Sequence, residues 1–166
     1  GADRDAADCE AEGPEAADSG TPRGAGNKAA GMSEHIGHSL PIQLRFGDTD
    51  RLGHINNAVY ATYAELGRLA FLERLGLDAP GLILARLAID FKKQVVLGDD
   101  CAITTRVVRV GTSSIEMAQT LTANGEVAAE YQAVIVWFDY RAQRPVRVPD
   151  DARARLLPPQ GQEPPR

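Results

Sequence analysis

Two carboxylates, an imidazole and two amides lie within one short polar stretch of the chain, at Asp48, Asp50, His54, Asn56 and Asn57. An alternating apolar segment precedes this stretch and a long apolar segment follows it, which predicts a loop between a strand and a helix. Backbone amides at a helix N-terminus can hold a developing oxyanion, while a nearby carboxylate acts on a carbonyl group or on water. The stretch is therefore suited to acyl chemistry such as thioester hydrolysis.

The flanking segments predict the order strand, long helix, four strands. Ile42, Leu44 and Phe46 alternate with polar residues, which predicts a first strand over residues 41–48. Apolar residues at helical spacing predict a helix over 57–75, with a stop at Gly76. Four strand-like segments joined by short connections follow, at 82–95, 101–110, 113–123 and 127–140. Asn124 and Gly125 form the strongest turn signal, and a short last helix is expected over 149–156.

An antiparallel sheet in this order must bury its apolar face, and the long helix is the element available to cover it. We therefore predict an α+β fold in which a five-stranded antiparallel sheet wraps around one long central helix. The order of elements alone also admits other topologies of a sheet and a helix.

Composition places this domain between two polar ends. Residues 1–39 are poor in large apolar side chains, so we expect a disordered or processed extension. We expect the folded domain at 40–157 and a flexible tail at 158–166. The net charge of −5 argues against a nucleic-acid or membrane partner, and the setting is expected to be cytoplasmic. Cys9 and Cys101 have neither disulfide nor zinc spacing, so no metal site is predicted.

One family signature is carried by the polar stretch and the start of the helix. The run from Phe46 to Asp50, continued by Gly53, His54 and the paired amides, resembles the signature of the 4-hydroxybenzoyl-CoA thioesterase-like acyl-CoA thioesterases, which have the hotdog fold. The likeness extends from about Pro41 to Pro149. It implies an acyl-CoA thioesterase that hydrolyses a thioester to a free acid and coenzyme A, which is part of the substrate, and that needs no separate cofactor.

The resemblance assigns roles to individual residues. It implies that Asp50 is the catalytic carboxylate, as nucleophile or through an activated water, and that the amide of Asn57 holds the thioester oxygen. His54 has a supporting position, and Tyr60 lies on the substrate side. Glu65 matches the helix glutamate of another hotdog branch, but an ordinary ion pair with Arg68, three residues on, is the favoured explanation.

Several of these residues also have structural interpretations. Asp48 is expected to bind loop amides, and either Asn56 or Asn57 can cap the helix. Gly67 suggests close approach of another backbone, such as a partner helix. In the family that the signature resembles, active sites lie at a dimer interface, so the resemblance implies a homodimer or homotetramer. Basic and hydroxyl side chains are candidates for holding the phosphates of coenzyme A, above all Arg109, Ser113 and Ser114, and with less support Lys92, Lys93, Arg106 and Arg141.

Two other functions remain open from the sequence. One is a non-catalytic acyl-CoA-binding protein with the hotdog fold, against which the presence of Asp50 argues. The other is an enoyl-CoA hydratase-like hotdog enzyme, which would need an aspartate and a histidine at a different spacing. The acyl group, and the choice between coenzyme A and an acyl carrier protein as thiol carrier, are not determined by the residues.

Overall fold

The computed structural model describes residues 37–77 and 81–157. The predicted tail at 158–166, and the predicted extension except for its last three residues, lie outside this part of the chain. Within it, the elements follow the predicted order with two additions, a short 3-10 helix and a two-residue strand. They are β1 (Gly37–Ile42), the 3-10 helix (Phe46–Asp48), α1 (Asn57–Arg74), β2 (Leu82–Phe91), β3 (Cys101–Val110), β4 (Ser114–Ala123), β5 (Glu126–Asp139), β6 (Arg144–Pro145) and α2 (Asp150–Leu156).

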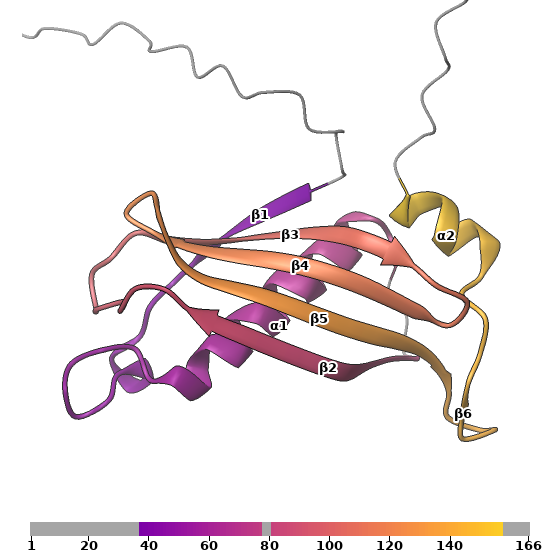
Figure 1. Ribbon diagram of the computed structural model, residues 1–166, viewed down its shortest axis with the longest axis horizontal. Coiled ribbons are helices and arrows are strands. Elements are labelled where there is room, and N and C mark those ends of the chain that lie inside the picture. Colours follow the sequence, from indigo (N-terminus) through magenta and orange to yellow (C-terminus); the bar gives the residue numbers. More distant parts are fainter. Residues whose placement is uncertain (1–36, 78–80, 158–166) are drawn as a thin grey trace, which may run out of the picture. The chain divides into compact units, whose positions relative to one another are not determined.

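The strands form one antiparallel sheet in the order β1-β3-β4-β5-β2, with β6 paired to the end of β5 (Figure 1). The hairpin between β4 and β5 turns at Asn124 and Gly125, whose φ angles of 52° and 81° confirm the predicted turn. β1 and β2, which α1 connects in the chain, are the two edge strands, and they pair with β3 and β5 respectively. No helix in the described part is long and apolar enough to span a bilayer.

The first strand differs from the prediction. It begins at Gly37 and ends at Ile42, because its register is set by pairing with β3 from Arg106 to Cys101. The alternation that continues to Phe46 is misleading, since Phe46 is 83% exposed and starts the 3-10 helix. The chain therefore leaves the sheet well before the candidate catalytic loop.

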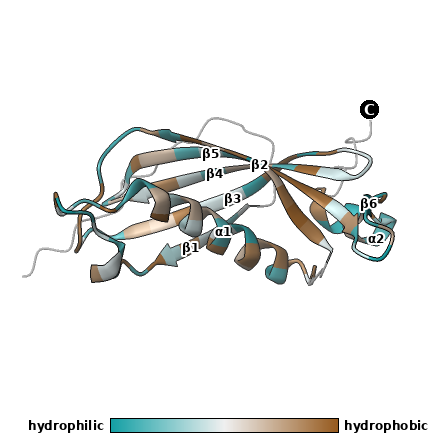
Figure 2. Ribbon diagram, turned by 90° about the horizontal axis from the view of Figure 1, so that it is seen from below, coloured by the Kyte–Doolittle hydropathy of each residue, from teal (hydrophilic) through white to brown (hydrophobic). Residues whose placement is uncertain are grey.

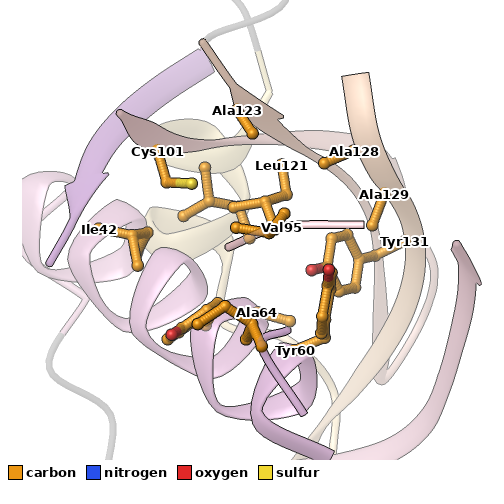
Figure 3. Close-up of a cluster of buried hydrophobic side chains, with 13 residues drawn as sticks. Ile42, Tyr60, Ala64, Val95, Cys101, Leu121, Ala123, Ala128, Ala129 and Tyr131 are labelled. Atoms are coloured by element: carbon orange, nitrogen blue, oxygen red, sulfur yellow. The ribbon is translucent and has the colours of Figure 1, made fainter. Parts of the chain in front are cut away.

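The helix α1 lies across one face of the sheet (Figure 2). It ends as predicted, since Gly76 has a φ of 65° and Leu77 N donates to Leu72 O at 2.9 Å. Two apolar clusters pack between α1 and the sheet, and the second one also includes Ala152 and Leu156 of α2. The cluster at the N-terminal end of α1 includes Tyr60, Ala64 and Tyr131 (Figure 3).

A buried polar group separates the two clusters. Gln119 of β4 donates to Thr105 Oγ1 and to Ala64 O, both at 2.9 Å, and accepts from Arg68 Nη1 at 3.2 Å. A Cβ atom on Gly67 would come within 2.9 Å of Gln119 Nε2. Gly67 therefore permits close approach of α1 to its own sheet, which accounts for this glycine without a partner helix.

Candidate active site

The loop between β1 and α1 is held by its own backbone. Asn56 N donates to Asp48 O, and Asp50 N donates to His54 O, both at 2.8 Å. Gly53, with a φ of 81°, closes the tip by donating from N to Asp50 O at 3.2 Å. These bonds fix where the polar side chains of the loop emerge.

The same loop is fastened to the segment that follows β2. Ile55 N donates to Val95 O at 2.8 Å, and His54 forms an isolated bridge with Val96. Ile55 and Val95 are both buried. The end of β2 and the N-terminus of α1 are therefore brought together around the loop.

Asp50 is oriented by one of its two carboxylate oxygens. Its Oδ1 accepts from Leu52 N at 2.8 Å and from His54 N at 3.2 Å. Within residues 37–77 and 81–157, no donor contacts Oδ2. One oxygen is thus held by loop amides while the other is available to a substrate or a water molecule.

Asp48 has a different environment. It is 6% exposed, and its Oδ2 accepts from Tyr63 Oη at 2.9 Å and from Arg45 N at 3.0 Å. Arg45 Nη2 lies 3.2 Å from Oδ1. Burial raises the pKa of Asp48, but the hydrogen bonds from Tyr63 and Arg45 outweigh it, so that the pKa lies below its ordinary value. Asp48 has the predicted structural contacts with the loop.

The N-terminus of α1 is capped by Asn56, whose Oδ1 accepts from Ala58 N at 2.9 Å. Asn57 is the first helical residue, so Asn56 is the cap of the two candidates. Val59 N donates to Asn56 O at 2.9 Å, whereas the N–H of Asn57 has no acceptor among the described residues. An unpaired amide at this end of an 18-residue helix is an anion-binding donor.

An open pocket of about 380 Å³ lies where the loop, the helix and the end of β2 meet. Tyr60 and Phe91 form an aromatic wall, with ring centroids 5.0 Å apart in an edge-to-face contact. Burial is the main cause of a raised pKa at Tyr60, and the charge of the neighbouring Cys101 thiolate adds to it. The pocket is lined by Asp50, His54, Ile55, Asn57, Tyr60, Phe91, Lys92, Lys93 and Gln94.

Four of the predicted residues, Asp50, His54, Asn57 and Tyr60, thus come together in this pocket. Lys92 and Lys93 also line it, and each is paired with an acid of β5, Lys92 with Glu130 at 3.0 Å and Lys93 with Glu126. Phe91 and Gln94 were not predicted. The aromatic residue at the end of an apolar strand was the available signal for Phe91, but only the tertiary contact with Tyr60 reveals its place.

The remaining candidates lie elsewhere. Glu65 is exposed on α1 and does not line the pocket. Glu65 and Arg68, both in the described part of the chain, do not form the expected ion pair. Arg68 is instead buried and donates to Gln119. Burial lowers the pKa of Arg68, and Glu65 partly offsets this shift.

Arg109, Ser113 and Ser114 lie at the turn between β3 and β4. Arg109 pairs with Glu116 at 3.5 Å. Since the Asp50 loop lies beside the start of β3, the length of β3 separates the turn from the pocket by about 30 Å. Within one chain, these residues are not part of the pocket. No group of three His, Cys, Asp or Glu side chains suited to a metal ion occurs among the residues of the described ranges.

Comparison with known proteins places this geometry in a family. The profile of the thioesterase-like superfamily matches residues 44–156. A chloroplastic acyl-acyl carrier protein thioesterase of Arabidopsis thaliana, ATL3, is 29% identical over 136 residues, which cover 76% of this chain and 70% of that protein. The acyl-CoA thioesterase YbgC of Haemophilus influenzae is 25% identical over 126 residues, covering 71% of this chain and 93% of that protein.

Solved structures agree with the family match. A thioesterase of Thermus thermophilus, crystallised with coenzyme A and zinc, is 35% identical, with a TM-score of 0.66 over 71% of this chain and 95% of that one. A predicted thioesterase of Bacillus stearothermophilus is 29% identical, with a TM-score of 0.69 over 73% of this chain and 94% of that one. The family profile and the fold of the solved structures thus agree. The chain belongs to the thioesterase-like superfamily, whose members are thioester hydrolases with the hotdog fold.

Proposed function

We propose that this thioester hydrolase cleaves acyl-CoA, with Asp50 as the catalytic carboxylate and the amide of Asn57 as the oxyanion donor. The observation that carries the proposal is that Asp50 Oδ2 and the first amide of α1 share one pocket and that neither has a hydrogen-bond partner among the described residues. A reactive carboxylate needs a free oxygen and a fixed orientation, and the loop amides of Leu52 and His54 supply the orientation.

Catalysis proceeds in the pocket by attack on the thioester carbonyl carbon. In one route Asp50 takes a proton from water, whose oxygen forms the new bond; in the other its carboxylate attacks and water then cleaves the resulting anhydride. In both routes negative charge develops on the carbonyl oxygen, and the Asn57 amide and the dipole of α1 stabilise it. Collapse of this oxyanion breaks the carbon–sulfur bond, and in the anhydride route this occurs before water attacks. The departing thiolate takes a proton from Asp50 in the water route and from solvent in the anhydride route. The free acid is the second product.

Coenzyme A is the proposed thiol carrier, and no separate cofactor is required. Lys92 and Lys93 support this choice because they bring two cations to the rim of the pocket, where phosphate oxygens can replace Glu130 and Glu126 as their partners. One relative is named an acyl-CoA thioesterase and another an acyl-acyl carrier protein thioesterase. The acyl carrier protein is therefore the alternative thiol carrier. Tyr60 and Phe91 provide the apolar wall for the acyl group.

A homodimer that pairs the edges of β2 would complete the site. β2 has ten residues, and its edge carries the exposed side chains of Leu84 and Phe91. A long apolar edge of this kind is prone to pair with another strand. In one chain, the β3–β4 turn and the Asp50 pocket lie at opposite ends of the sheet. A two-fold axis reverses the direction of the second sheet, so the partner's β3–β4 turn lies at the same end as the Asp50 pocket. In such a dimer, Arg109, Ser113 and Ser114 hold the coenzyme A phosphates at the neighbouring subunit's pocket.

The test is thiol release, measured with Ellman's reagent on acyl-CoAs from short aliphatic to long aliphatic and aryl, and on the same acyl groups carried by acyl carrier protein. Wild type is compared with Asp50→Asn and with Glu65→Gln as the control carboxylate. We expect turnover of acyl-CoA by wild type and Glu65→Gln, and its loss in Asp50→Asn.

Other outcomes have definite meanings. Loss in Glu65→Gln with activity retained in Asp50→Asn would move the site to the helix. Turnover of only the carrier-protein substrates would replace coenzyme A as the thiol carrier. Binding of acyl-CoA without cleavage would contradict the proposed catalytic role.

A further inference from the structure

The sheet has a second hollow, on the face that points away from α1. Its volume is about 380 Å³, and side chains of β2, β3, β4 and β5 line it. Arg106, Ala118 and Gln132 lie opposite one another in one row across β3, β4 and β5. Their chain neighbours Thr105 and Gln119 are buried beneath α1, so alternation along the strands turns this row to the opposite face. The hollow is therefore separate from the Asp50 pocket.

Two β-bulges frame the hollow. In β2 the pairing shifts between Leu84 and Arg86, so that Leu84 lies opposite the buried Ile135 and Arg86 opposite Val134. In a regular strand, residues two apart such as Leu84 and Arg86 would face the same side of the sheet. In β3 a second shift leaves Val108 without a partner and 51% exposed. Bulges re-aim side chains beside functional sites, and here the bulge in β2 turns Arg86 toward the hollow.

The charges that line the hollow are not balanced. Arg86 and Arg106 form no ion pair with residues of the described ranges. Glu116 is the acidic residue among those that line it, and it is paired with Arg109 at 3.5 Å. The guanidinium groups of Arg86 and Arg106 thus flank the hollow, while the Glu116 carboxylate that lines it is already paired with Arg109.

We propose that this hollow binds a phosphorylated small molecule of the nucleoside diphosphate class. Arginine forks match phosphate oxygens, and two of them suit a group with two negative charges. The amide of Gln132 adds a neutral donor, and the small side chain of Ala118 leaves space over the floor. The volume falls in the range of small-molecule sites and exceeds what one phosphate ion fills. The site is independent of the proposed catalytic pocket.

The test is isothermal titration calorimetry of the full chain with ADP, inorganic pyrophosphate and unphosphorylated adenosine. The variant Arg86→Gln with Arg106→Gln removes the two arginines of the hollow. The double variant Arg141→Gln with Arg144→Gln removes the same charge from the exposed hairpin between β5 and β6. The double variant Lys92→Gln with Lys93→Gln removes the cations of the catalytic pocket, so it separates binding there from binding in the hollow.

We expect ADP to bind wild type and both control variants, adenosine not to bind, and the arginine variant of the hollow to lose at least tenfold in affinity. Three results would overturn the proposal. They are no ADP binding by wild type, binding that disappears only with Lys92 and Lys93, and dissociation of an oligomer in the Arg86, Arg106 variant by light scattering. The last result would make the hollow an interface between copies of the chain.

Discussion

Asp48 and Asp50 lie two residues apart, on opposite sides of one loop. The inner side holds Asp48, whose carboxylate receives hydrogen bonds from Tyr63 and Arg45 and is almost fully buried. The outer side holds Asp50, which has two partners on one oxygen and none among the described residues on the other. A free carboxylate oxygen, and not the residue type, thus separates the candidate catalytic carboxylate from the structural one.

The largest expected effect is on Asp50. Asp50→Asn keeps the size of the side chain and its hydrogen bonds to the loop amides but removes the carboxylate charge. We expect kcat to fall by about 10² to 10⁴-fold, with little change in the unfolding midpoint. Steady-state kinetics and urea unfolding of the same preparation measure the two quantities. A large loss of stability would place Asp50 with Asp48 as a structural residue.

Asp48→Asn is expected to act mainly on stability, by about 1–3 kcal/mol, because it weakens charged hydrogen bonds in a buried site. Its pH dependence sharpens the comparison. The folded-state pKa of Asp48 lies below its ordinary value of 3.8, so its stabilisation is present above that pH and is lost as the pH falls through the folded pKa. Urea unfolding of both proteins should show a steady difference near pH 7 that shrinks below about pH 4. A difference that grows with acidity would contradict this.

Asn56→Ala tests the helix terminus that faces Asp50. Loss of the bond to Ala58 N should lower the free energy of unfolding by about 1 kcal/mol and loosen the first turn of α1. If the Asn57 amide is the oxyanion donor, kcat should fall more than KM changes. Asn57→Ala is the matched control, since it removes the side chain and keeps the backbone donor. Equal losses of kcat in both variants would count against a backbone donor.

Tyr131 offers the opposite case to Asp48, a buried polar group without a partner. Its Oη is unpaired among the described residues, and the side chain is 2% exposed beside Tyr60 (Figure 3). Tyr131→Phe should therefore leave stability unchanged or raise it by about 1 kcal/mol, in contrast to Tyr63→Phe, which removes a bond to Asp48. Thermal unfolding of the two variants gives the comparison. A clear loss in Tyr131→Phe would indicate a partner for this hydroxyl.

The smallest effect is expected at Glu65. It is exposed and outside the pocket, and it makes no ion pair with the buried Arg68. Glu65→Gln should leave kcat and KM within about twofold of wild type. It should change the free energy of unfolding by no more than a few tenths of a kcal/mol. A loss comparable with that of Asp50→Asn would mean that the helix carboxylate takes part in the reaction.

Much of the fold was predictable because local pattern and tertiary structure agree. The long helix has apolar spacing, a cap and a glycine stop, and β3 has its predicted bounds of Cys101–Val110. The first strand was misplaced because alternation continues through Phe46, while the true register depends on pairing with β3, far along the chain. A local pattern cannot report which of two adjacent segments finds such a partner.

The site divides in the same way. Asp50, His54, Asn57 and Tyr60 are close in sequence, and the loop and the first turns of α1 bring them together. The pocket wall at Phe91 arises from packing between α1 and β2, which no short motif encodes. The placement of Arg109, Ser113 and Ser114 depends on the direction and length of β3, so their distance from the pocket was not evident from spacing.

The most direct test of the central claim is a paired measurement on Asp50→Asn and Asp48→Asn, with thiol release from the best acyl-CoA and urea unfolding recorded for each. We predict that Asp50→Asn loses activity and keeps stability, while Asp48→Asn loses stability and keeps most of its activity under conditions where it is folded. If Asp50→Asn kept wild-type turnover, or if Asp48→Asn were the inactive but stable protein, the assignment of the catalytic carboxylate would be wrong.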